Sequence, residues 1–171
     1  MYKNVLRQFN KKMNKRIPRL KIGDKAPDFS ANDQSGNKIN LTDFRGKKVV
    51  LYFYPEYDTP GCTVQSCNLR DHYQTLLDKG YEVLGVSNDD EESHRKFIKK
   101  FSLPFTLIAD TDKKIVHDYD VYGEKQFMGN KYEGIHRITY VIDERGYIEN
   151  IITHVDTEHH TDQILAEPKS V

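Results

Sequence analysis

The chain contains two cysteines, Cys62 and Cys67, which stand five positions apart. This spacing is neither the Cys-x-x-Cys of dithiol oxidoreductases nor that of a zinc-ligand pair. Two cysteines in 171 residues are also too few for a disulfide scaffold. No apolar secretory segment opens the chain, so we expect a reducing compartment. The cysteine pair therefore favours a chemical role over a structural one.

Cys62 has the sequence context of a nucleophile. A cysteine attacks as its thiolate, and an ordinary thiol with a pKa of about 8.5 is only about 3% ionised at pH 7. The first amides of a helix stabilise an anion, because they point at it without another partner. Thr59 and Pro60 predict such a helix start directly before Cys62, with a hydroxyl cap followed by proline in the first turn. A nearby fixed cation would supply further stabilisation.

The spacing of the cysteines constrains how they can react with each other. If Cys62 and Cys67 share one α-helix, their Cα atoms lie ~8.6 Å apart, from about 1.5 Å of rise and about 100° of rotation per residue. A disulfide needs about 4.4–6.8 Å. Either the two sulfurs never pair, or the first turns of the helix unwind during function. Two unrelated cysteines are the simple alternative, and a metal site that uses His72 or glutamates has no recognisable ligand spacing.

The elements that position Cys62 follow from the hydrophobic pattern. The continuous apolar run Val49–Tyr54 predicts a central strand that ends at Pro55. The other expected elements are a hairpin at 28–41, a helix from the cysteines to Gly80, a strand at 81–87, a helix after 88–92, a strand at 105–109, a helix at 115–119, a hairpin of 137–143 and 147–155, and a last helix from near Glu158.

This order predicts an α/β, thioredoxin-like fold, in which a mixed central sheet is flanked by helices and preceded by an extra N-terminal β-hairpin. In such sheets ligands bind at the carboxyl ends of the parallel strands. Residues 55–62 leave the central strand at that end and enter a helix. The fold therefore places Cys62 where a ligand is expected.

The charges of the chain are unevenly distributed. Residues 1–23 hold eight Lys and Arg and no acid, although the net charge of the chain is zero. We expect a basic leader or tail at 1–21, a thioredoxin-like domain at 22–167 and a C-terminal tail at 168–171. The leader is expected to be solvated, with a transit peptide or a nucleic-acid tether as alternatives. Met13 is an alternative start, and His159 and His160 are expected to be surface or capping residues.

Three motifs occur in the order typical of one known family: Pro55–Cys62 with the pattern Pro-x-x-x-Thr-x-x-Cys, Cys67–Asp71, and Gly134–Asp143. Through them the chain resembles the peroxiredoxin family, and specifically its Q-type subfamily, also called bacterioferritin comigratory protein. The resemblance covers residues 22–165. Two departures stand out: Gln65, where many members have glutamate, and Tyr122, where the family often has tryptophan. The first is expected to alter the local hydrogen-bond network, and the second to alter packing.

The resemblance implies a role for each motif residue. Cys62 would be the peroxidatic thiolate and Cys67 the resolving thiol. Thr59 would donate a hydrogen bond to the bound peroxide, and Pro55 would shield the sulfur from bulk water. Arg137 would stabilise the thiolate and the charge that develops on the leaving oxygen. Fixed donors aimed at an O–O bond that breaks are electrostatic preorganisation for a nucleophilic displacement.

The resemblance also implies the reaction and its partners. Hydrogen peroxide and organic hydroperoxides would be reduced through a Cys62 sulfenic acid and an intramolecular Cys62–Cys67 disulfide. Thioredoxin or a similar dithiol would reduce this disulfide, without metal, haem or flavin. The expected protein acts in antioxidant defence in the cytoplasm as a monomer or weak homodimer, without a membrane or nucleic-acid partner. Organellar targeting by the leader is the alternative location.

Two other functions are compatible with parts of the sequence. A thiol–disulfide oxidoreductase of the same fold is the enzymatic alternative, although such an enzyme typically requires the Cys-x-x-Cys spacing that this sequence lacks. A binding domain whose basic leader docks on nucleic acid or acidic membranes is the non-enzymatic alternative. The second alternative is compatible with peroxidase activity in the same chain.

Overall fold

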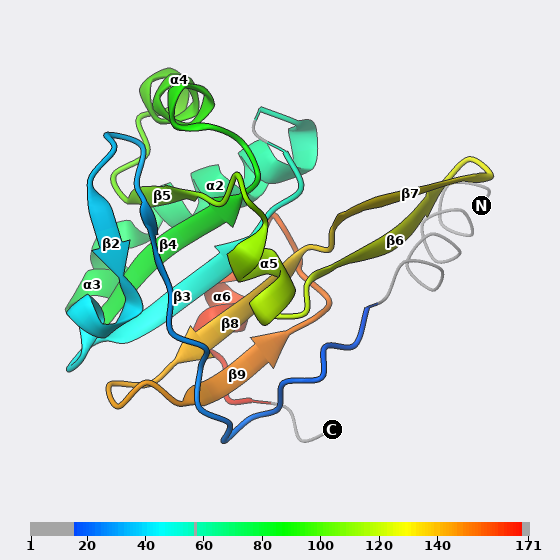
Figure 1. The fold of residues 1–171 in the computed structure, drawn as a ribbon. Helices are drawn as coiled ribbons and strands as arrows, with labels where there is room; N and C mark the ends of the chain where they lie inside the picture. The colour runs from blue at the N-terminus through cyan, green and yellow to red at the C-terminus, as the bar shows by residue number, and fades with distance from the viewer. Residues whose placement is uncertain (1–15, 57, 169–171) are drawn as a thin grey trace, which may run out of the picture.

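The centre of the molecule is a five-stranded sheet (Figure 1). The structure is a computed structural model that describes residues 16–56 and 58–168. The strand order is β5-β4-β3-β8-β9, with the bounds β3 Lys48–Phe53, β4 Tyr81–Ser87, β5 Thr106–Ala109, β8 Ile138–Ile142 and β9 Ile148–Ile152. Strands β3, β4 and β5 run parallel, and β8 pairs antiparallel with both β3 and β9. This is the mixed sheet that the sequence predicts.

Both faces of the sheet are covered. In β3, Val49, Leu51 and Phe53 pack into one cluster of buried side chains, whereas Val50 and Tyr52 pack into the other. Because both faces are buried, this strand is apolar at every position after Lys48 rather than at every second one. The second cluster also includes residues of four helices, α2 (Pro60–Asp71), α3 (Tyr73–Asp78), α4 (Glu91–Phe101) and α6 (His160–Leu165). On the first face lie α5 (Lys114–Asp118), the 3-10 helix η1 (Leu41–Phe44) and the hairpin of β1 (Ser30–Asn32) and β2 (Lys38–Asn40) (Figure 1).

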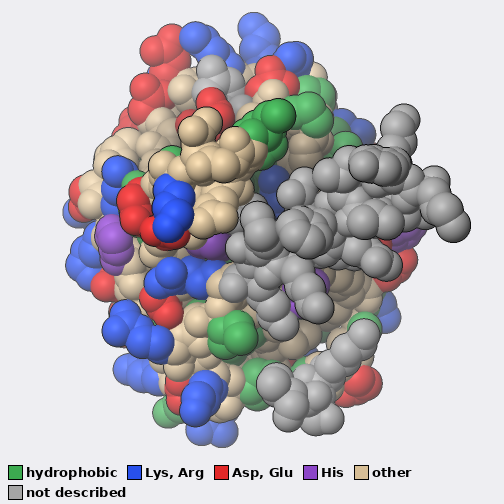
Figure 2. Space-filling model, turned by 90° about the vertical axis from the view of Figure 1, so that its right-hand side faces the viewer, with side chains coloured by type: hydrophobic (Ala, Val, Ile, Leu, Met, Phe, Trp, Pro, Cys, Tyr) green, Lys and Arg blue, Asp and Glu red, His purple; other side chains and the backbone are tan. Residues whose placement is uncertain are grey.

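The structure contains the 3-10 helix η1, which was not expected, and it differs from the expected elements in two further places. The single helix expected up to Gly80 is interrupted at His72, where α2 ends and α3 begins. A hairpin of β6 (Tyr122–Phe127) and β7 (Asn130–Ile135) was not expected at all. It projects from the body of the molecule (Figure 1). Figure 2 shows the molecule from the side toward which this hairpin projects. Hydrophobic side chains gather in the upper part of that view.

The turn of this hairpin explains why the sequence did not reveal it. Met128 and Gly129 both have positive φ angles, 49° and 82°. A two-residue turn of this kind ordinarily carries Asn-Gly or Asp-Gly, so the methionine conceals the usual signal. The strands are also mostly exposed and polar, and they lack the alternation of apolar residues that predicts a half-buried strand.

The last residues of the expected leader lie against the domain. The Arg16 guanidinium donates to the Asp120 carbonyl at 2.7 Å and to the Asp120 carboxylate at 2.6 Å, and the Arg19 amide donates to the same carboxylate at 2.8 Å. Burial opposes ionisation of Asp120, but these hydrogen bonds hold the pKa of its carboxyl below the usual value. The boundary at residue 22 stays a prediction, and Met13 and residues 169–171 lie outside the described residues. Within the described ranges no helix has the length and apolar character that a membrane crossing requires.

The expectation for the histidine pair is half wrong. His159 is exposed and occupies the N-cap position of α6, beside Asp156. His160, however, is fully buried, and its Nε2 lies 2.8 Å from the Thr139 hydroxyl. A second histidine, His94 of α4, is equally buried. Both rings are held in the core because neighbouring polar groups satisfy at least one of their nitrogens.

We expect the free energy of unfolding to decrease as the pH falls from about 6.5 to about 4. Burial lowers the pKa of His94 and of His160 to about 4 in the folded protein, whereas an unfolded chain has the ordinary value of about 6.5. Between these pH values the unfolded chain binds protons that the folded chain does not, so acid favours unfolding. Across the whole window the loss is about 3 kcal/mol for each histidine.

Urea unfolding at about pH 7.5 and about pH 4.5 measures this loss. A His94→Gln variant carries one titrating ring fewer, so its free energy of unfolding should depend less on pH than that of the wild type. Equal stability of the wild type at both pH values would contradict the prediction, and so would an unchanged pH dependence in the variant.

Candidate active site

Cys62 lies in the first turn of α2, at the carboxyl end of β3. Thr59 is the N-cap residue with extended backbone, φ −90° and ψ 152°, and Pro60 is the first helical residue. The amides of Gly61 and Cys62 have no carbonyl one turn earlier within the helix, so they are free to face an anion. The Cys62 side chain is fully buried. The helix start that the sequence predicts is therefore present.

The hydroxyl of Thr59 does not act as the expected cap. It donates to the Glu56 carbonyl at 3.1 Å, and it makes no hydrogen bond to the amides of the first turn. This bond closes the loop between β3 and α2. Pro55, two residues after β3, is half-buried in the same loop. The expected contacts of Thr59 and Pro55 with a peroxide stay predictions.

Arg137 is the residue that the fold brings to the sulfur. It lies between β7 and β8, and its Nη2 donates to Cys62 Sγ at 3.2 Å. Its Nη1 donates to Gln65 Oε1 at 2.6 Å. A Cβ atom added at Gly61 would stand 3.1 Å from Arg137 Nη2, so this glycine allows the guanidinium to approach α2 closely. The guanidinium and the helix start thus converge on one sulfur.

Gln65 has a more specific place than the sequence indicated. It is fully buried, one turn after Cys62 on the same face of α2, and it holds Arg137 beside the sulfur. An amide does this without a negative charge, whereas a carboxylate at this position would neutralise the guanidinium. The positive charge of Arg137 is therefore available to a thiolate. The spacing of three residues between Cys62 and Gln65 was the signal in the sequence.

Both cysteines lie on the one uninterrupted helix α2, and both are free thiols. Cys67 is half-buried. The cysteines therefore do share one helix, as the sequence predicts. Helix geometry separates their Cα atoms by ~8.6 Å, which is too far for a disulfide. A bond between the sulfurs requires the first turns of α2 to unwind. Between the cysteines, the Ser66 hydroxyl lies 3.1 Å from the Tyr52 hydroxyl and connects this part of α2 to β3.

The C-terminal half of α2 is fixed to its surroundings. The Asn68 amide nitrogen donates to the Glu158 carbonyl at 2.8 Å, and Asn68 Oδ1 accepts from the Thr161 amide at 2.9 Å. Arg70 Nη1 donates to the Phe101 carbonyl at 2.7 Å. These bonds connect α2 to α6 and to the end of α4. Unwinding that starts at Cys62 therefore meets a fixed segment directly after Cys67.

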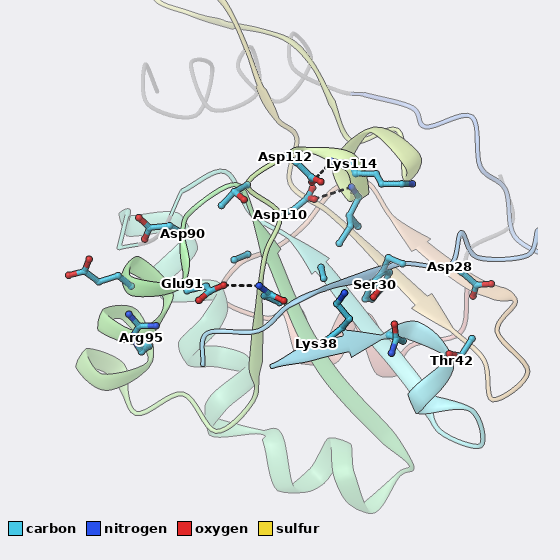
Figure 3. A pocket seen from close by; sticks show the side chains of 18 residues that line it. Asp28, Ser30, Lys38, Thr42, Asp90, Glu91, Arg95, Asp110, Asp112 and Lys114 are labelled. Carbon is cyan, nitrogen blue, oxygen red and sulfur yellow. Dashed lines mark hydrogen bonds between the residues drawn. The ribbon is translucent and has the colours of Figure 1, made fainter. Parts of the chain in front are cut away.

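A groove of about 900 Å³ lies away from the sulfur, between the β1–β2 hairpin, the start of α4 and the turn after β5 (Figure 3). Neither cysteine nor Arg137 lines it. Two of its charged groups serve local structure: Asp110 accepts from the amides of Ile115 and Val116, and Glu91 accepts from the Asn32 side chain. Among residues 16–56 and 58–168, no group of three or more His, Cys, Asp or Glu side chains could hold a metal ion.

Comparison with known proteins identifies the family of the chain. Residues 22–151 match the model of the AhpC/TSA family. The chain is 49% identical to peroxiredoxin Bcp of Escherichia coli over 146 residues, which are 85% of this chain and 94% of that protein. Over 152 residues it is 37% identical to peroxiredoxin Bcp of Bacillus subtilis, covering 89% of this chain and 97% of that protein.

Solved structures give the same result. A PrxQ variant of Xylella fastidiosa superposes with a TM-score of 0.81 at 27% identity, over 86% of this chain and 94% of that one. The bacterioferritin comigratory protein of Xanthomonas campestris superposes with a TM-score of 0.77 at 30% identity, over 81% and 87%. Both structures and both curated relatives come from bacteria, and organellar targeting by the leader is not borne out.

A thioredoxin-like fold with a buried, arginine-paired cysteine at a helix start defines the class of thiol-dependent peroxidases. The chain belongs to the AhpC/TSA family, as a peroxiredoxin of the Q-type, or bacterioferritin comigratory protein, subfamily. It is an oxidoreductase that consumes a peroxide and a thiol reductant.

Proposed function

We propose that the chain reduces hydrogen peroxide and organic hydroperoxides with Cys62 as the attacking thiolate and Cys67 as the resolving thiol. One observation carries the proposal: Arg137 Nη2 donates to the buried Cys62 Sγ at 3.2 Å, at the start of a helix that also holds Cys67. The related Xanthomonas campestris bacterioferritin comigratory protein has alkyl peroxide reduction activity, which supports organic hydroperoxides as substrates.

The first step is a displacement at oxygen. The Cys62 thiolate forms a bond to the terminal peroxide oxygen, the O–O bond breaks, and the remaining oxygen leaves as water or alcohol after it takes up a proton. The products are water or alcohol and the Cys62 sulfenic acid. Arg137 stabilises the charge that moves from sulfur to the leaving oxygen, and Gln65 keeps the guanidinium in place. Thr59 and Pro55 complete the site in this proposal, by donating to the peroxide and by excluding water.

The second step joins the two sulfurs. The first turns of α2 unwind, and the Cys67 thiolate attacks the sulfenic sulfur. The S–S bond forms as the S–O bond breaks, and the leaving hydroxide takes up a proton to become water. Thioredoxin or a similar dithiol protein then attacks this disulfide and returns both thiols. The protein acts as a monomer or weak homodimer in the cytoplasm, where a dithiol reductant is available. We also propose that residues 22–167 form the peroxidase domain, between a leader and a short C-terminal tail.

One equivalent of hydrogen peroxide added to the reduced protein tests this function. We expect a loss of about two mass units, because the disulfide forms with the removal of two hydrogens. Digestion should yield a peptide that contains a Cys62–Cys67 bond, and a dithiol should restore the original mass. A protein that gains oxygen without ever forming the bond, or that does not react, would refute the assignment of Cys62 as the attacking thiolate and Cys67 as the resolving thiol.

A further inference from the structure

Ser66 and Tyr52 connect α2 to the sheet at a point between the two cysteines. The Ser66 hydroxyl lies 3.1 Å from the Tyr52 hydroxyl, and either group can be the donor. Both side chains are fully buried. If Ser66 moved away, the Tyr52 hydroxyl would stay in the core without this partner, and a buried hydroxyl that loses its partner is costly.

The Tyr52 hydroxyl is a fixed point, because the ring that carries it is held by its neighbours. The ring stacks on that of Tyr54 with centroids 5.4 Å apart, and it meets the ring of Phe105 edge to face at 5.9 Å. On the adjacent strand β4, a Cβ atom added at Gly85 would stand 2.8 Å from Tyr52 Cζ, so this glycine leaves the space for the ring. The hydroxyl therefore does not follow Ser66 when α2 moves.

Ser66 lies in the segment of α2 that has to move before the sulfurs can pair. The buried face of this helix consists of Cys62, Gln65, Ser66 and Leu69. Five helical steps place Cys67 roughly 140° around the axis from Cys62. Because Ser66 directly precedes Cys67, turning Cys67 toward Cys62 turns Ser66 away from Tyr52. Disulfide formation therefore requires the Ser66–Tyr52 hydrogen bond to break.

This hydrogen bond differs from the contacts that activate the sulfur. Arg137 donates to Cys62 and to Gln65, so a change in either contact alters the attack on the peroxide. The Ser66–Tyr52 bond joins two neutral hydroxyls and includes neither the sulfur nor the guanidinium. It stabilises the wound helix without taking part in the first step.

We propose that the Ser66–Tyr52 hydrogen bond is a latch that holds α2 wound and sets the lifetime of the Cys62 sulfenic acid before Cys67 reaches it. This inference rests on the proposed roles of the two cysteines. Ser66 and Tyr52 are positioning residues, because they act through the helix that carries both sulfurs. The latch slows the second step and leaves the first step unchanged.

The lifetime of the sulfenic acid determines how much of it a second peroxide molecule can oxidise. In that reaction the sulfenic sulfur forms a bond to the terminal peroxide oxygen and the O–O bond breaks. The remaining oxygen takes up the proton that the sulfenic acid loses, and it leaves as water or alcohol. The sulfur is oxidised to a sulfinic acid and the second peroxide is reduced. Because a thiol does not reverse this oxidation, the latch influences the fraction of protein inactivated at each turnover.

The test measures both steps of one turnover, by the mass of protein quenched at successive times after mixing with hydrogen peroxide. We expect Ser66→Ala to convert the sulfenic acid to the disulfide about fivefold faster, the effect of one lost neutral hydrogen bond. Sulfenic acid formation should stay within about threefold of the wild type, and the sulfinic fraction at a fixed excess of peroxide should fall about fivefold. Alanine is a better helix former than serine, so helix propensity alone would slow the conversion.

Tyr52→Phe removes the same hydrogen bond from the sheet side, so it should accelerate the conversion by a similar factor. The double variant should be no faster than either single variant, because both substitutions remove one bond. Tyr73→Phe is the matched control. The Tyr73 hydroxyl donates to Glu82 Oε1 at 2.7 Å, and its ring packs on Phe105 as that of Tyr52 does, but Tyr73 lies on α3. Its conversion rate should equal that of the wild type.

Unchanged conversion in both single variants overturns the inference, and so does a double variant about 25-fold faster than the wild type, the product of two independent effects. Equal acceleration in Tyr73→Phe would mean a general loosening of the core, which also overturns it. A slower first step in Ser66→Ala would assign the hydroxyl to the peroxide site instead. If the wild type never forms the Cys62–Cys67 bond, the proposed function fails first, and this outcome is distinct from all the others.

Discussion

Arg137→Met is expected to slow the reaction of Cys62 with hydrogen peroxide by roughly 10²–10³-fold, the cost typical of removing one preorganised donor from a site of charge development. The variant loses the 3.2 Å hydrogen bond to Cys62 Sγ and the cation that accompanies it. It also leaves the buried Gln65 Oε1 without its donor. The measurement is the second-order rate constant of a single turnover, followed by the mass of the quenched protein.

Two variants separate charge from geometry. Arg137→Lys retains the positive charge, but its single nitrogen does not reproduce the two guanidinium nitrogens that contact Cys62 and Gln65, so an intermediate rate is expected. Arg145→Met serves as the control, because Arg145 lies in the turn between β8 and β9 and packs on the Tyr147 ring. A rate for Arg137→Met within about threefold of the wild type would contradict the catalytic role of Arg137.

Cys67→Ser is expected to abolish sustained turnover with a dithiol reductant, by roughly 100-fold or more, while the first turnover proceeds at the wild-type rate. Cys67 makes no hydrogen bond to Cys62 or Arg137 in the reduced protein, so its removal leaves the peroxide site unchanged. Without it the Cys62 sulfenic acid has no thiol in the same chain. The oxidised variant should therefore gain one oxygen instead of losing two hydrogens.

Steady-state and single-turnover rates of the same preparation measure whether sustained turnover is lost while the first turnover is retained. Val64→Ser is a suitable control, since Val64 is exposed on α2 between the two cysteines. Its turnover should match that of the wild type. If Cys67→Ser does not react even once, Cys67 belongs to the attacking site, and the division into two roles is wrong.

The sequence predicts the parts of the fold that depend on local patterns. The strand β3 is visible because its residues are apolar on both faces, and the start of α2 is visible because Thr59 and Pro60 precede Cys62. Strand β4 occupies the expected residues 81–87. These features are encoded within a few residues, so one sequence is enough to find them.

The sequence does not predict features that arise from contacts between distant segments. The β6–β7 hairpin lacks a hydrophobic pattern, and its Met128-Gly129 turn hides the usual signal. The burial of His160 depends on Thr139 of β8, and the position of Arg16 depends on Asp120. The role of Gln65 depends on the position of Arg137, which donates to its side chain. In each case the partner is far away along the chain, and a local motif does not report on it.

The fixed C-terminal half of α2 has a consequence for how the reductant recognises its target. Because Asn68 and Arg70 are tied to α6 and α4, melting is expected to stop near Cys67 and to leave a short loop that carries the disulfide outward. In the proposed cycle, a peroxide would react with the wound helix, and a dithiol protein would react with the melted loop. The two partners would therefore bind different conformations of one segment, and the oxidation state of the sulfurs would determine which conformation is populated.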